Sequence, residues 1–66
     1  MKTPVRGQSG HVIGYVEDLG DGRQKALDES YRVLGHYDPA SDLTKDRFNL
    51  MVGRGNQLVA LIRQGR

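Results

Sequence analysis

Three short apolar runs recur along the chain, and a glycine interrupts each of them directly after an apolar pair. The pairs are Val12-Ile13, Val33-Leu34 and Met51-Val52, and the glycines that follow them are Gly14, Gly35 and Gly53. Runs of this length that are rich in branched and aromatic residues, with glycine and acidic residues around them, are typical of β-strands. The pattern therefore predicts strands that belong to an internal repeat.

The repeat predicts three consecutive β-hairpins within a single domain. Its glycines are separated by 21 and 18 residues, and Gly7, Asp28 and Asp46 stand seven positions before them. Internal repeats of roughly this length indicate supersecondary units that stack or surround an axis. We expect hairpin repeats over residues 5–22, 23–42 and 43–56, with a further segment over 57–64. Glycine within a strand marks a bulge, a bend or a close backbone approach, so we expect the hairpins to converge on a shared apolar centre.

The segments between the runs have the composition of turns and loops. Residues 18–22 and 38–42 are rich in aspartate, glycine, serine and proline, which favour turns. Residues 24–28 fit either a strand or a short helical turn, and the apolar run that follows favours a strand.

Alternation of side chains along a strand predicts which residues share a face. One face would hold Val12, Gly14 and Val16, with Val33, Gly35 and Tyr37, and with Met51, Gly53 and Gly55. The other would hold Ile13 and Tyr15, with Leu34 and His36, and with Val52 and Arg54. Because both faces are apolar before each glycine, we expect an all-β fold with a closed or folded-over sheet, barrel-like or flower-like in form.

The segment over residues 56–64 fits two interpretations. Asn56 suits a helix N-cap, Gly65 suits a C-cap, and Leu58, Leu61 and Ile62 fall on one helical face. As a strand, the same segment is apolar enough to close the sheet. The capping residues favour a short helix.

Two hairpin motifs carry a resemblance to a known family. They are Asp28-x-x-x-Arg32-Val33-Leu34-Gly35-x-Tyr37-Asp38 and Asp46-x-x-x-x-Met51-Val52-Gly53. These motifs resemble the repeats of the four-fold beta-flower proteins, over residues 7–55. The resemblance implies a small all-β module of unassigned function, in which similar hairpins surround a pseudo-symmetry axis. The turn glycine of that pattern is replaced by Tyr31 in the second copy and by Asn49 or Phe48 in the third, and a fourth copy is not evident.

A second stretch has a different resemblance. Gly10-His11-Val12-Ile13-Gly14-Tyr15-Val16-Glu17-Asp18-Leu19 is similar to the opening of a PRC-barrel domain, a small β-barrel used as an interaction module. Both resemblances imply a β domain without enzymatic activity.

The size of the chain limits how it can be stabilised. A 66-residue domain buries only about 60% of the surface that its unfolded chain exposes. The chain has no cysteine, so disulfides and thiolate metal sites are excluded. We therefore expect it to bury apolar surface against itself, as a homodimer or small oligomer, or against a larger protein. It has neither a transmembrane run nor a signal peptide, so we expect a soluble cytoplasmic protein.

The net charge of +2 is unevenly distributed along the chain. Residues 1–44 carry five basic and seven acidic groups, whereas residues 45–66 carry five basic groups and one acidic group. The basic third supports an alternative function, a small nucleic-acid-binding domain with phosphate contacts from Arg47, Arg54, Arg63 and Arg66. The clustered aromatic residues of base-stacking sheets are missing, which favours the interaction module.

Three polar residues directly follow the repeat glycines and form a candidate binding rim. They are Tyr15, His36 and Arg54, which together would suit an anionic or planar ligand or a partner peptide. The two histidines lack the spacing of a zinc site, and no serine stands in a nucleophile motif. Leu58 stands where the dinucleotide fingerprint beginning at Gly53 requires glycine. We therefore predict no catalytic residue, metal or cofactor.

Overall fold

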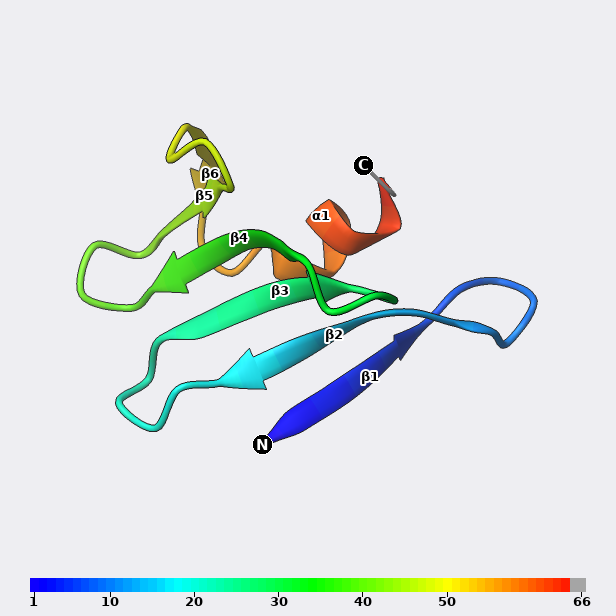
Figure 1. Ribbon diagram of the computed structural model, residues 1–66. Helices are drawn as coiled ribbons and strands as arrows, with labels where there is room; N and C mark the ends of the chain where they lie inside the picture. The colour runs from blue at the N-terminus through cyan, green and yellow to red at the C-terminus, as the bar shows by residue number, and fades with distance from the viewer. Residues whose placement is uncertain (65–66) are drawn as a thin grey trace.

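A computed structural model describes residues 1–64 as an antiparallel sheet with one helix against it (Figure 1). The six strands pair in chain order: β1 (Lys2–Arg6), β2 (Val12–Asp18), β3 (Gln24–Asp28), β4 (Val33–Asp38), β5 (Leu43–Asp46) and β6 (Met51–Arg54). Helix α1 (Leu58–Arg63) packs against β2, β3 and β4. The all-β fold with a short C-terminal helix is thus confirmed, and β1 and β6 are the outer strands of the sheet order.

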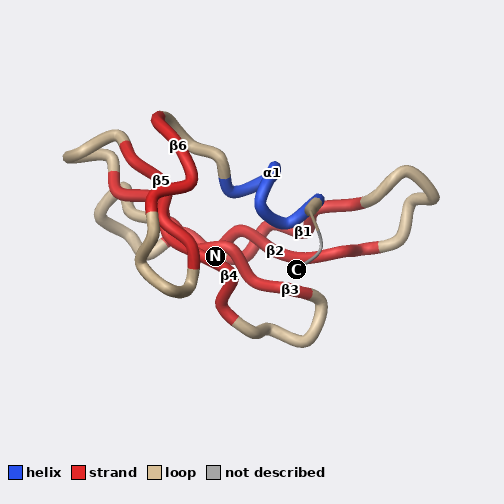
Figure 2. The backbone as a smooth tube through the Cα atoms, turned by 90° about the horizontal axis from the view of Figure 1, so that it is seen from above, coloured by secondary structure: helices blue, strands red, loops and turns tan. Residues whose placement is uncertain are grey.

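The third hairpin stands apart from the rest of the sheet. Figure 1 shows β5 and β6 rising out of the plane formed by β1 to β4. Seen from above, α1 lies between this hairpin and the hairpin of β1 and β2 (Figure 2). The sheet therefore folds around one side of the helix, and β6 lies outside the strands that α1 covers.

All three hairpins close with the same five-residue turn. The turns span residues 7–11, 28–32 and 46–50. In each, the first residue donates its amide N–H to the carbonyl of the fifth, and the fourth donates its amide to the carbonyl of the first. The fourth residue has a positive φ in every copy: 85° at Gly10, 68° at Tyr31 and 67° at Asn49. The internal repeat is therefore a repeat of backbone geometry, and it continues where the turn glycine does not.

Aspartate side chains support the two turns that lack glycine. Asp28 Oδ1 accepts hydrogen bonds from the amides of Ser30 and Arg32, at 2.8 and 2.9 Å. Asp46 Oδ1 accepts the equivalent bonds, from the third and fifth residues of its own turn. A side-chain oxygen that satisfies two turn amides offsets the strain of a left-handed residue other than glycine. This is the physical reason why the repeat places aspartate seven residues before its glycine.

Each hairpin also carries a β-bulge at the equivalent position. Val5 pairs with Gly14 and Arg6 with Val12, which leaves Ile13 as the extra residue, and the extra residues of the other hairpins are Leu34 and Val52. A bulge interrupts the alternation of side chains. Ile13 and Leu34 consequently pack into the core under the helix, on the same side as the glycine that follows each of them. The predicted assignment of Ile13 and Leu34 to the opposite face from those glycines was therefore wrong.

Two of the repeat glycines lie directly beneath α1. A Cβ atom at Gly14 would lie 2.5 Å from the carbonyl oxygen of Leu27 and 2.6 Å from Ile62 Cγ2. A Cβ atom at Gly35 would lie 2.5 Å from Leu61 Cδ2 and would also meet a backbone carbonyl of β5. The glycines thus let the helix approach the sheet closely.

The third repeat glycine lacks this constraint. A Cβ atom at Gly53 would have Gln57 Cγ as its nearest neighbour, at 3.6 Å, which is ordinary van der Waals contact. The expectation that three kinked hairpins converge on an axis therefore needs correction. The hairpins lie side by side in one sheet, and their glycines make room for a helix over the first two.

The core is small and lies between the helix and the middle strands. Ala26, Leu34, Leu58 and Ile62 are buried, and partly buried residues surround them, among them Val16, Tyr37 and Leu61. Leu58, Leu61 and Ile62 thus share one helical face, as the sequence predicts.

Buried Thr44 fixes the connection between β6 and α1. Its hydroxyl donates to the carbonyl of Gly55, at 2.7 Å, and accepts the amide of Gln57, at 2.9 Å. Asn56 was predicted as the N-cap, but the N-cap residue is Gln57, whose side chain makes no capping bond. Asn56 lies one residue earlier and still accepts the amide of Leu58. Gly65, the expected C-cap, lies outside the described residues.

Replacement of Thr44 by valine should destabilise the protein by roughly 1–3 kcal/mol, because it leaves buried backbone groups without a partner. Valine has nearly the same shape, so little packing changes. Urea unfolding monitored by circular dichroism measures the effect. Thr44→Ser, which keeps the hydroxyl, is the matched control, and equal stability of the valine variant and the parent would contradict this role.

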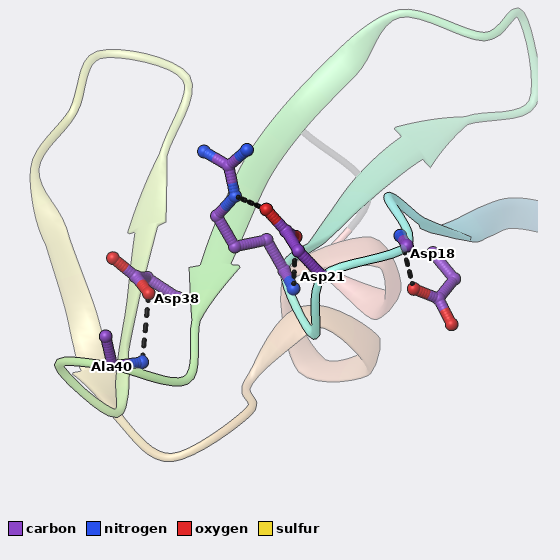
Figure 3. Close-up of polar contacts among 6 residues, drawn as sticks. Asp18, Asp21, Asp38 and Ala40 are labelled. Carbon is purple, nitrogen blue, oxygen red and sulfur yellow. Dashed lines mark hydrogen bonds and ion pairs between the residues drawn. The ribbon is translucent and has the colours of Figure 1, made fainter.

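The loops between hairpins are closed by aspartate side chains at one end of the sheet (Figure 3). Asp18 Oδ1 accepts the amide of Gly20 at 3.0 Å, and Asp38 Oδ1 accepts the amide of Ala40 at 2.9 Å. Asp21 accepts both the amide and the guanidinium Nε of Arg23. These bonds, above all the backbone one, hold the pKa of Asp21 below its usual value. The carboxylates of these loops therefore have a structural role.

Candidate interaction surface

The three rim residues share the open face, which is the face of the sheet opposite α1. Tyr15 and His36 pair with residues two positions apart on β3, and His36 and Arg54 pair with residues two positions apart on β5. The three side chains therefore follow a diagonal across the sheet, each two strands from the next. The structure places them on one face without gathering them at one point.

The ring of Tyr15 packs against a side chain from the second hairpin turn. The ring centroids of Tyr15 and Tyr31 lie 5.0 Å apart, and Lys2 Nζ lies 5.4 Å from the centroid of Tyr31. The pKa of Tyr15 is raised, mainly by its side-chain hydrogen bond with Tyr31 and secondarily by desolvation. Tyr31 thus covers part of the open face beside Tyr15.

His36 lies in a row of charged side chains that crosses the open face. Cross-strand pairs order this row as Lys2, Glu17, Lys25, His36 and Lys45. Glu17 forms ion pairs with Lys2 and Lys25, at 3.9 and 3.4 Å. His36 also lines a hollow of about 220 Å³ with Lys45. Neither Tyr15 nor Arg54 reaches this hollow.

The arginines of the nucleic-acid alternative come from separate parts of the fold. Arg47 lies in the third turn, where its guanidinium stacks 5.0 Å from the ring centroid of Phe48. Arg54 lies on β6, and Arg63 lies in the last turn of α1, beside the first hairpin turn. Arg66 lies outside the described residues. Arg47 and Arg63 line different hollows, and Arg54 lines neither of these.

The most distinctive feature of the molecular surface is a group of exposed apolar residues on the third hairpin, which the sequence analysis did not single out. We call it the third-hairpin patch, and it consists of Phe48, Leu50, Met51 and Val52. Their exposed fractions are 69%, 63%, 64% and 37%. All four lie in the turn or on β6, within five residues of one another. Single exposed apolar residues are common, whereas four of them within one five-residue stretch, on both faces of the hairpin, indicate a candidate interaction surface.

The repeat shows that the third turn departs from the other two. The turn positions of Phe48 hold Ser9 and Ser30 in the first two hairpins. The positions of Leu50 hold His11 and Arg32. Because all three turns have the same backbone geometry, the fold does not require apolar residues there. The geometry of the turn therefore does not account for the exposed Phe48 and Leu50.

The other half of the patch is exposed because the helix does not reach it. Leu34, the bulge residue of β4, is only 6% exposed beneath α1. Val52 is the bulge residue of β6 and remains open, because α1 packs on β2, β3 and β4. The third hairpin thus has the same apolar pattern as the first two, but α1 does not cover it.

These features define a hairpin-repeat, all-β domain with one uncovered apolar hairpin. No family model matches the chain, and neither does any curated protein or solved structure. Within residues 1–64 there is no helix long and apolar enough to cross a membrane. The same residues contain no group of three histidine, cysteine, aspartate or glutamate side chains placed to share a metal ion.

Proposed function

We propose that the protein is a soluble cytoplasmic interaction module that works by binding and that self-associates through the third-hairpin patch. The observation that carries the proposal is the replacement of exposed serine and basic residues by Phe48 and Leu50 in a turn of unchanged geometry. Side chains of this kind bring no nucleophile, acid or base. They stabilise a complex because their apolar surface is removed from contact with water when the complex forms.

The size of the domain supports self-association. The core contains few fully buried side chains, of which the helix supplies Leu58 and Ile62. A domain this small gains stability from a partner surface. Burial of the patch against a second copy would provide such a surface for both chains.

Conversion of the third turn to the residues of the second tests the proposal. Phe48→Ser combined with Leu50→Arg is expected to weaken self-association at least about tenfold, since buried apolar anchors carry most of an interface's binding energy. Sedimentation velocity across a concentration series gives the dissociation constant. Circular dichroism should show the fold unchanged, because both side chains are exposed.

Val59→Ser is the matched control, because Val59 is an exposed apolar residue of α1 outside the patch. Its dissociation constant should equal that of the parent. A parent protein that stays monomeric at every concentration would overturn the proposal, as would equal weakening by both variants.

Salt separates this function from nucleic-acid binding. The third hairpin carries Lys45, Arg47 and Arg54 against one carboxylate, Asp46. Two copies that meet there repel one another, so screening should strengthen their association. Phosphate contacts weaken steeply as salt rises. Binding of generic DNA that decreases with salt, without self-association, would favour the nucleic-acid alternative.

A further inference from the structure

The two outer edges of the sheet differ in their ability to accept another strand. The first turn fixes which backbone groups of β1 point outward, because Gly7 donates its amide across the hairpin to His11. Alternate residues of an antiparallel strand direct their amides to opposite sides. Counted back from Gly7, the outward positions on β1 are Arg6, Pro4 and Lys2.

Pro4 therefore has no N–H at the point where an added strand would need a donor. Proline and charged side chains on an edge strand are devices that prevent edge-to-edge pairing. With Pro4 between Lys2 and Arg6, the outer edge of β1 is closed to a further strand.

In the described part of the chain the outer edge of β6 is unpaired, and the only charged side chain of the strand is Arg54. In the first two hairpins, the second strand pairs on its outer side with the next hairpin from its repeat glycine onward, β2 with β3 from Gly14 and β4 with β5 from Gly35. β6 is the equivalent strand of the third hairpin, and no strand of residues 1–64 follows it. The strand contains no proline.

Apolar side chains flank this edge on both sides. Met51 pairs with Lys45, which belongs to the charged row of the open face. Val52 is the bulge residue, equivalent to Leu34, which faces the helix side. A strand that is apolar on both faces is typical of the interior of a sheet, where neighbours cover both.

We propose that β6 pairs antiparallel with β6 of a second copy around a two-fold axis, so that the two sheets join at their β6 edges. The inference rests on the proposed self-association and specifies its geometry. Pairing of β6 with the β1 edge of another copy would be head-to-tail and would extend into filaments. Because Pro4 closes the β1 edge, β6 has only another β6 as an equivalent partner, and the assembly ends at a dimer.

Single cysteines test this geometry, since the parent chain has none. A disulfide forms only between residues whose Cα atoms approach within about 7 Å. Near a two-fold axis, a residue meets its own copy. We therefore expect Met51→Cys or Val52→Cys alone to give a disulfide-linked dimer under mild oxidation on a non-reducing gel. Lys2→Cys, on the exposed part of β1, is the matched control and should give no disulfide-linked dimer band.

The failures of the two proposals are distinguishable. If sedimentation under reducing conditions shows a dimer but neither β6 variant cross-links to itself, the β6 geometry is wrong while self-association stands. A mixture of Met51→Cys and Lys2→Cys chains that cross-links only between the two variants would establish head-to-tail pairing. A monomer by sedimentation would overturn both proposals.

Discussion

Replacement of Gly14 by alanine is expected to destabilise the protein by the upper part of the roughly 1–3 kcal/mol range for an overpacked core, or by more. The added methyl would meet the carbonyl oxygen of Leu27 on one side and Ile62 on the other. Neither can move freely, because one is backbone in the sheet and the other is a buried core residue. Gly35→Ala would meet the backbone carbonyl of Lys45 and the partly buried side chain of Leu61, and it should also destabilise the protein.

Gly53→Ala is the control that the repeat itself supplies. It occupies the equivalent position of the third hairpin, and its nearest contact would be an ordinary 3.6 Å to Gln57. None of the three glycines has a left-handed φ, so backbone strain does not separate them. We expect Gly53→Ala to stay within about 0.5 kcal/mol of the parent. Urea unfolding of the three variants measures the difference, and equal losses at all three positions would show that the helix does not impose the glycines.

The repeat could be recognised in the sequence because it follows from interactions between residues close together in the chain. A turn that needs a left-handed residue and an aspartate acceptor leaves a fixed spacing, from Asp28 to Gly35 and from Asp46 to Gly53. The helix could be predicted for a similar reason, since Leu58, Leu61 and Ile62 already share one helical face. Such features need no knowledge of distant contacts.

The features that the sequence missed depend on register and cover. A bulge adds one residue to a strand, so a face assigned by simple alternation is inverted beyond it, as happened for Ile13 and Leu34. The burial of Leu34 and the exposure of Val52 follow from which strands α1 covers. The placement of the helix on the sheet is tertiary information, which the pattern of apolar residues does not contain.

The third-hairpin patch did leave a signal, in the comparison of the three turns position by position. Ser9 and Ser30 align with Phe48 once the turns are superposed on their left-handed residues. The alignment on Gly14, Gly35 and Gly53 already sets this register. A repeat protein therefore provides its own reference, and a copy that becomes more apolar at an exposed position indicates a surface that meets a partner.

Leu58→Ala should destabilise the protein by about 2–5 kcal/mol, since it removes a fully buried side chain and leaves a cavity beneath the helix. The helix has only six residues and depends on packing for its stability. Without the helix, the apolar residues of the first two hairpins would be exposed, as those of the third hairpin are. The adjacent Val59→Ala is the control: Val59 is 44% exposed, so its truncation should cost far less. Thermal unfolding by circular dichroism compares them, and a tolerant Leu58 would mean that the sheet is stable without its helix.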